Sequence, residues 1–196
     1  MTRSNTSLIR KSILFLIAAM FSVSAMALDF NQVQRLANQG NIAAQGALGA
    51  MYYQGEGVRQ DYSKAVQWYQ KAANQGDAGA KFLLGLMYYR GEGVRQDYSK
   101  VIQLLEESAN QGHAGAQATL AGMYQDGEGV RQDYSKAVQW YQKAANQGNA
   151  GAQARLGRMY YQGEGVRQNK VIAKEWFGKS CDNGLQIGCD AYRLLN

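Results

Sequence analysis

One short string recurs along the chain at a constant interval, and this repetition limits the possible folds more than any other feature. The string GEGVRQ begins every 36 residues, at Gly55, Gly91, Gly127 and Gly163. The string NQG recurs in the same register, at Asn38, Asn74, Asn110 and Asn146. A tandem period of this length is typical of stacked helical units, each of which buries its apolar face only against its neighbours.

Each unit has the pattern of two amphipathic helices. In the first copy, apolar residues follow helical spacing in two runs, namely Ala44, Leu48, Met51 and Tyr52, then Ala65, Trp68, Tyr69, Ala72 and Ala73. Proline is absent from the chain and glycine occurs 23 times, so glycines must make the turns. We expect Gly55 to end the first helix in a left-handed conformation and Asp61 to cap the second. The unit is therefore predicted to be an αα-hairpin.

The residues of this unit resemble those of a known family. In the first copy, alanine is followed by three residues, LG, one residue, MY, two residues and GEGV, and then by QDYSKAVQWYQKAANQG. This pattern is similar to the Sel-1-like repeat, a relative of the tetratricopeptide repeat. The resemblance covers almost all of residues 28–196. It implies a right-handed superhelix of helix pairs that serves as an adaptor or scaffold in protein complexes, in bacteria often in the envelope. The copies depart from the pattern at Leu104 and Leu105, at Ala121 and Gly122, and at residues 169–173.

We therefore predict an all-α solenoid of four αα-hairpin repeats with a capping helix at each end. The expected boundaries are 1–27 for a signal peptide, 28–40 for an N-terminal cap, 41–76, 77–112, 113–148 and 149–184 for the repeats, and 185–196 for a C-terminal half-repeat. In the N-terminal cap we expect Phe30, Val33 and Leu36 to face inward.

The first 27 residues have the pattern of a cleavable secretory signal peptide. Three basic residues precede an apolar run at residues 13–23, and small residues follow at Ala25 and Ala27. The alternative is an uncleaved membrane anchor, but the run is shorter than the roughly 20 residues of a spanning helix. No cysteine follows Ala27 to mark a lipoprotein, and no later stretch is long and apolar enough to span a bilayer. We expect a periplasmic or secreted protein.

Removal of this segment lowers the positive charge. The chain has 21 Lys and Arg and 15 Asp and Glu, and residues 1–27 hold three of the basic residues and none of the acidic ones. The remaining net charge is +3, and each repeat mixes both signs. This balance indicates a solvated surface and does not favour nucleic acid as a partner.

The two cysteines, Cys181 and Cys189, both lie in the last part of the chain. Their register places Cys181 at the end of a second helix and Cys189 in the next first helix, where antiparallel neighbours come within disulfide reach. In an exported protein we expect the pair to be oxidised and to staple the terminal cap. The alternative, a redox-active or metal-binding pair, lacks close spacing and a partner histidine.

Other patterns point to structure more than to chemistry. His113, the single histidine, aligns with Asn41, Asp77 and Asn149 as a residue that begins a helix, so it is not expected to be a base or a metal ligand. GEGVRQ lacks the third glycine of a phosphate-binding loop and follows a helix instead of a strand. The acidic residues Asp126, Glu128 and Asp133 lack the spacing of a calcium-binding loop, so they are expected to be turn and cap residues. We expect no cofactor and no metal.

A partner surface is expected where near-identical copies differ. In tetratricopeptide-like stacks the first helix of each hairpin lines the concave face. In this chain, the positions of these helices that are turned away from the core form a stripe, and the residues of this stripe vary between the copies. We single out the candidate partner-binding residues Leu83, Leu86, Arg90, Thr119, Arg155 and Arg158. They predict a groove with an apolar patch and a basic end that holds a peptide or an envelope polymer. The alternative is neutral drift at surface positions.

Two functional classes remain at this point. The first is an exported protein-binding scaffold without enzymatic activity. The second is a β-lactamase-like or penicillin-binding envelope enzyme, because some cysteine-rich relatives are described in that way. Those relatives carry a cysteine pair in each repeat, however, and this chain has one pair and no nucleophile with an adjacent base.

Overall fold

A computed structural model describes residues 30–195, and all regular secondary structure in that range is helical. The predicted signal peptide, residues 1–27, lies outside the described residues. A helix at residues 30–38 comes first. The helices that follow are α2 (Ile42–Gln54), α3 (Tyr62–Asn74), α4 (Ala78–Arg90), α5 (Tyr98–Asn110), α6 (Ala114–Asp126), α7 (Tyr134–Asn146), α8 (Ala150–Gln162), α9 (Lys170–Asp182) and α10 (Gln186–Leu194). The prediction of an all-α chain of helical hairpins is confirmed.

The ends of the helices form as the sequence predicts. The first helix of each hairpin begins at a residue whose side chain accepts a hydrogen bond from the third backbone N–H of that helix, and these caps are Asn41, Asp77, His113 and Asn149. Each of these helices ends at a glycine with a left-handed backbone, as at Gly55, where φ is 78°. His113 is thus a capping residue, with Nδ1 accepting from the Ala116 N–H at 3.1 Å.

The described residues fall into two compact units that divide between Ala72 and Ala73. In the first unit, Leu48, Ala65 and Tyr69 are buried. Gly49 lets α2 approach α3 closely, because a Cβ at that position would come within 2.7 Å of the Tyr69 ring. The expected orientation of Leu36 in the N-terminal cap is wrong. Leu36 is 40% exposed, and the neighbouring Ala37 is the buried residue, because the helix turns this side toward α2, where Gln45 Nε2 donates to the Ala37 carbonyl at 3.2 Å.

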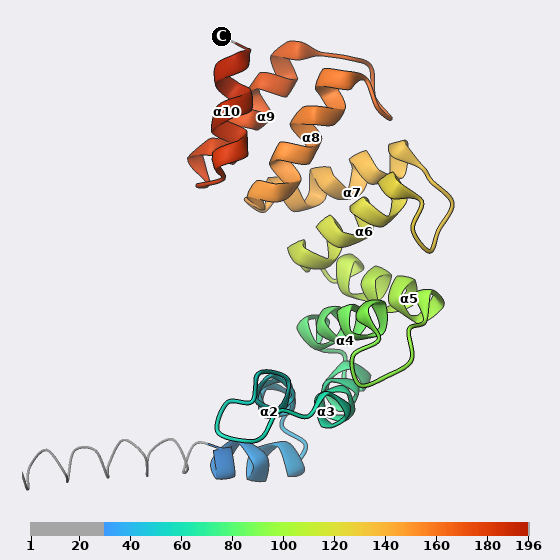
Figure 1. The fold of residues 1–196 in the computed structure, drawn as a ribbon, viewed down its shortest axis with the longest axis vertical. Helices are drawn as coiled ribbons and strands as arrows, with labels where there is room; N and C mark the ends of the chain where they lie inside the picture. Colours follow the sequence, from blue (N-terminus) through green and yellow to red (C-terminus); the bar gives the residue numbers. More distant parts are fainter. Residues whose placement is uncertain (1–29, 196) are drawn as a thin grey trace, which may run out of the picture. The chain divides into compact units, whose positions relative to one another are not determined.

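The second unit contains α4 to α10, in which each helix packs against the next (Figure 1). Its core is a series of buried layers, including one around Val101, Leu105 and Leu120 and another around Leu156 and Met159. The loops that join α4 to α5, α6 to α7 and α8 to α9 lie on one side of this unit (Figure 1). Neighbouring hairpins therefore bury their apolar faces against each other, as a repeat stack requires.

A hydrogen bond recurs between successive hairpins of this unit. Gln117 Nε2 donates to the Ala109 carbonyl at 3.0 Å, and Gln153 Nε2 donates in the same way to the Ala145 carbonyl, also at 3.0 Å. Both amides are buried, so the bond satisfies a carbonyl at the end of the preceding helix. One repeat earlier the glutamine is replaced by Lys81, which forms an ion pair at 2.7 Å with Glu107.

The expected disulfide joins Cys181 of α9 to Cys189 of α10, with a Cα–Cα distance of 4.5 Å. By repeat register, Cys189 stands where Gln153 stands one repeat earlier, and Cys181 stands where Ala145 stands. The covalent bond therefore takes the place of the hydrogen bond that links the preceding hairpins.

Candidate functional site

The predicted stripe begins on α4. Leu83 is 38% exposed and Leu86 is half-buried, so both present apolar surface that the core does not use. Arg90, at the end of the helix, is exposed, and its guanidinium lies 3.8 Å from the Glu92 carboxylate. Surface ion pairs of this kind contribute little stability. The pair is therefore not a structural reason for the apolar surface that the two leucines present beside it.

On α6 the stripe is less suited to binding. Thr119 is half-buried, and its hydroxyl donates to the Gly115 carbonyl of the same helix at 2.9 Å. This bond satisfies the hydroxyl within α6. Thr119 therefore offers a partner mainly its methyl group.

The stripe ends on α8 in a groove that we call the α8–α10 groove. It has a volume of about 490 Å³ and is lined by Gly151, Ala154, Arg155, Arg158, Phe177, Leu185, Ile187 and Ala191. Arg155 and Arg158 are exposed, and neither guanidinium forms a hydrogen bond or an ion pair with any residue that the structure describes. The groove thus combines two unpaired cations with an apolar wall, which is the arrangement of polar and apolar groups found in specific binding sites.

The two arginines act electrostatically on Tyr141 of α7, which is hydrogen-bonded to α6. The side chain of Tyr141 is buried, and its hydroxyl donates to Gln125 Oε1 at 3.1 Å. Burial raises the pKa of Tyr141, Arg155 and Arg158 lower it, and Asp126 raises it. The phenol therefore remains neutral beside the arginines, and their charge is not cancelled by a phenolate.

The structure brings together only part of the predicted site. Arg155 and Arg158 line the α8–α10 groove, whereas the remaining candidates on α4 and α6 line no part of it. The role of Leu83, Leu86, Arg90 and Thr119 in binding stays a prediction.

Two wall residues of the groove, Leu185 and Ile187, were missed by the sequence analysis although the repeat register marks them. Leu185 stands in the slot that Asn149 occupies as a helix cap, and α10 has no side-chain cap hydrogen bond. Ile187 stands where the preceding repeat has Gly151, and it is 66% exposed. An apolar residue at a capping or glycine slot was the signal that could have found this wall.

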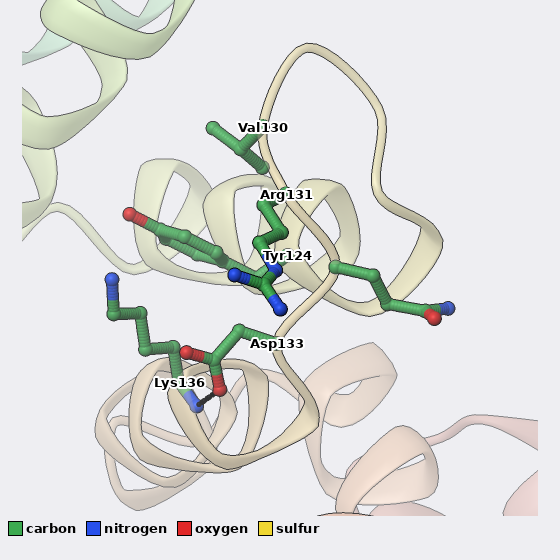
Figure 2. A pocket seen from close by; sticks show the side chains of 6 residues that line it. Tyr124, Val130, Arg131, Asp133 and Lys136 are labelled. Atoms are coloured by element: carbon green, nitrogen blue, oxygen red, sulfur yellow. Dashed lines mark hydrogen bonds between the residues drawn. The ribbon is translucent and has the colours of Figure 1, made fainter.

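A second kind of pocket lies in the loop between α6 and α7 (Figure 2). It has a volume of about 600 Å³, and its lining is Tyr124, Val130, Arg131, Gln132, Asp133 and Lys136. Several of its polar groups already have partners in the turn. Asp133 caps α7 through a hydrogen bond from the Lys136 backbone N–H at 2.9 Å, and the Lys136 ammonium lies 5.0 Å from the centre of the Tyr124 ring.

The same pocket recurs one repeat earlier, with a volume of about 480 Å³ and the lining Tyr88, Val94, Arg95, Gln96, Asp97 and Lys100. Because it is copied with the repeat and its polar groups stabilise the turn, we assign it to the scaffold. The α8–α10 groove, by contrast, arises from residues that differ between the copies.

Glu128, in the turn between α6 and α7, also has structural partners. Glu128 accepts hydrogen bonds from the hydroxyls of Tyr89 at 2.9 Å and Tyr98 at 3.0 Å, which ties the third turn to the second hairpin. Among the described residues, no group of three His, Cys, Asp or Glu side chains is placed to hold a metal ion. Within residues 30–195, no helix has both the length and the apolarity needed to cross a membrane.

Comparison with solved structures finds the same architecture in bacterial proteins. A protective antigen of uropathogenic Escherichia coli strains, described as displaying an SLR fold, is 40% identical, with a TM-score of 0.81 over 83% of this chain and 35% of that chain. A Sel1 repeat protein from Oxalobacter formigenes is 34% identical, with a TM-score of 0.81 over 87% of this chain and 49% of that one. Cysteine rich protein B of Helicobacter pylori is 27% identical, with a TM-score of 0.54 over 67% of this chain and 94% of that chain.

The chain thus spans half or less of the length of the first two structures. Comparison with curated proteins finds no match. The Sel1 repeat pattern itself matches four consecutive segments, residues 42–77, 78–113, 114–149 and 150–185. These segments contain the four hairpins described above. The chain therefore belongs to the Sel1 repeat family, whose helical hairpins are in general non-enzymatic scaffolds for protein–protein interaction.

Proposed function

We propose that the chain is an exported scaffold that binds a protein or peptide partner, or an envelope polymer, in the bacterial envelope. Sel1 repeats generally bind proteins, which supports the class of function. The signal-peptide pattern of residues 1–27 supports export. The disulfide between Cys181 and Cys189 agrees with an oxidising compartment.

The observation that carries the proposal is the state of Arg155 and Arg158. Arginine pairs readily with carboxylates and phosphates, and two exposed arginines without a partner in the described chain leave this capacity free. They lie beside apolar surface that the core does not use, and such mixed surfaces are typical of protein interfaces. The surface therefore suits recognition of another molecule.

The test is capture of a partner from an envelope extract. Cross-linking followed by mass spectrometry is applied to the tagged protein and to the variants Leu86→Asp and Arg158→Asp, made singly and together. We expect the double variant to lose the partner, because one change places a charge on the apolar patch and the other reverses the charge of the groove. Gln139→Asp, on an exposed position of α7, is the matched control and is expected to retain the partner. Unchanged capture by the double variant would refute this surface.

Export is tested separately. We expect cell fractionation to place the protein in the periplasm or the medium, and N-terminal sequencing to show cleavage after Ala27. A full-length chain in the cytoplasm or the membrane fraction would refute export without bearing on the binding surface.

A further inference from the structure

The α8–α10 groove is built from departures from the repeat pattern. Arg155 replaces Ala47, Leu83 and Thr119 of the preceding copies, and Arg158 replaces Ala50, Leu86 and Gly122. Leu185 replaces a capping residue, and Ile187 replaces a glycine or alanine. Four such changes that line one cavity point to a common role, whereas drift would scatter them over the surface.

The polar part of the groove fits a carboxylate. Arg155 and Arg158 are three residues apart on α8, so their side chains lie on the same face of the helix. A guanidinium presents its donors in a planar fork that matches the two oxygens of a carboxylate. Because neither guanidinium is paired with a described residue, an incoming carboxylate displaces no ion pair.

The apolar part of the groove fits a large hydrophobic side chain. Phe177 is buried at the base, while Leu185 is half-buried and Ile187 largely exposed in the wall. An exposed isoleucine beside a half-buried leucine gives α10 little core stability, and Leu185 leaves the helix without a side-chain cap. Contact with a partner would remove this apolar surface from water.

The disulfide holds this wall in position. Leu185 and Ile187 lie within the loop that the bond between Cys181 and Cys189 closes. α10 has nine residues, and a helix of that length is unstable unless it is fixed by its surroundings. The covalent link therefore keeps the apolar wall facing the two arginines of α8.

We propose that the α8–α10 groove anchors an extended segment of a protein partner that carries an acidic residue and a large apolar residue, separated by one residue. In an extended chain, residues two apart point to the same side, so both side chains enter the groove together. The carboxylate binds Arg155 and Arg158, and the apolar side chain packs on Phe177, Leu185 and Ile187. The volume of about 490 Å³ lies in the range of specific ligand sites. This inference rests on the proposed scaffold function and specifies the partner's chemistry.

The experiment is selection of a random peptide library displayed on phage against the purified, oxidised protein. We expect enrichment of peptides with Asp or Glu two positions from Leu, Ile, Phe or Met. An enriched peptide, synthesised with a fluorescent label, should bind the variant Arg155→Glu with Arg158→Glu at least about tenfold more weakly, and likewise Ile187→Asp. Arg131→Glu, which alters an exposed arginine of the repeated turn, should bind as the unmodified protein does. Circular dichroism verifies that each variant retains its helices.

Three results would overturn the inference: no enrichment, enriched peptides without acidic residues, or binding by the arginine variant within about twofold of the unmodified protein. A concentration-dependent dimer that Ile187→Asp dissociates would also overturn it, because a second copy would then occupy the groove. If extract capture is lost in Leu86→Asp but kept in Arg155→Glu with Arg158→Glu, the scaffold function stands and the groove inference fails.

Discussion

Removal of the disulfide tests directly how the terminal hairpin is held. The bond between Cys181 and Cys189 spans eight residues of sequence. For a loop of this size the chain-entropy relation gives a stabilisation of about 2.5 kcal/mol. α10 packs on α9 but buries few of its own side chains, because Gly188 is its buried residue while Ile187 and Leu194 are 66% and 85% exposed. Loss of the bond should therefore release α10 first.

Native-state hydrogen exchange measures this release at the amides of α10. The double variant Cys181→Ala with Cys189→Ala should exchange about 70-fold faster there, the factor that corresponds to about 2.5 kcal/mol. Amides in the buried middle of α6 should be unaffected, because local opening of the cap leaves the preceding hairpins intact.

The repeat itself supplies the matched variant. Cys181→Ala with Cys189→Gln restores the residue pair of the preceding repeat, in which Gln153 donates to the Ala145 carbonyl. A hydrogen bond of this kind contributes about 1 kcal/mol, so exchange in α10 should be about fivefold slower than in the double alanine variant. Exchange within twofold of the unmodified protein in the alanine variant, or no difference between the two variants, would refute the reasoning.

Three further predictions concern the scaffold. In the variant Glu128→Gln, the pKa values of Tyr89 and Tyr98 should fall toward the ordinary value, because the carboxylate that raises both is gone. Tyrosinate absorbance during an alkaline titration measures this fall, and an unchanged titration curve would contradict it. The variant Gly165→Ala should lower the free energy of unfolding in urea by roughly 1–3 kcal/mol more than Gly57→Ala does, because both glycines have φ 70° but only a Cβ at Gly165 overlaps the Tyr134 carbonyl. Equal losses of stability in the two variants would refute the overlap. Burial, with a smaller contribution from Tyr53, raises the pKa of Tyr69 from 10.0 to about 12, so the tyrosine of the unfolded state ionises first and stability is lost as the pH rises from 10 to 12. The variant Tyr69→Phe should therefore lose less ellipticity than the unmodified protein in that pH range, and an identical loss would contradict this.

The repeat period and the local residue types were sufficient to predict the hairpins. Left-handed glycines such as Gly55 and caps such as Asn41 act within a few residues, so their roles can be read without knowledge of the rest of the chain. His113 was assigned to a helix start on register alone, and the structure confirms the cap. The register of the two cysteines likewise placed them on adjacent helices within reach of each other.

The candidate site was predicted only in part, because a groove depends on side chains from several helices. Arg155 and Arg158 were found because they differ from the earlier copies at an exposed stripe. Leu185 and Ile187 were missed, because their helix was predicted only as a terminal cap. The inward orientation of Leu36 was wrong for a related reason, since helical periodicity alone does not say which face of the first helix packs against α2.

The sequence by itself thus determined where the first helix of each hairpin begins and ends and that the two cysteines lie within reach on neighbouring helices, because these depend on local backbone geometry and on a repeated register. The tertiary structure decided which variable residues meet. It placed Arg155 and Arg158 against the wall of α10 and left Leu83 and Leu86 outside that groove, because the meeting of side chains from α8, α9 and α10 depends on how three helices pack in space.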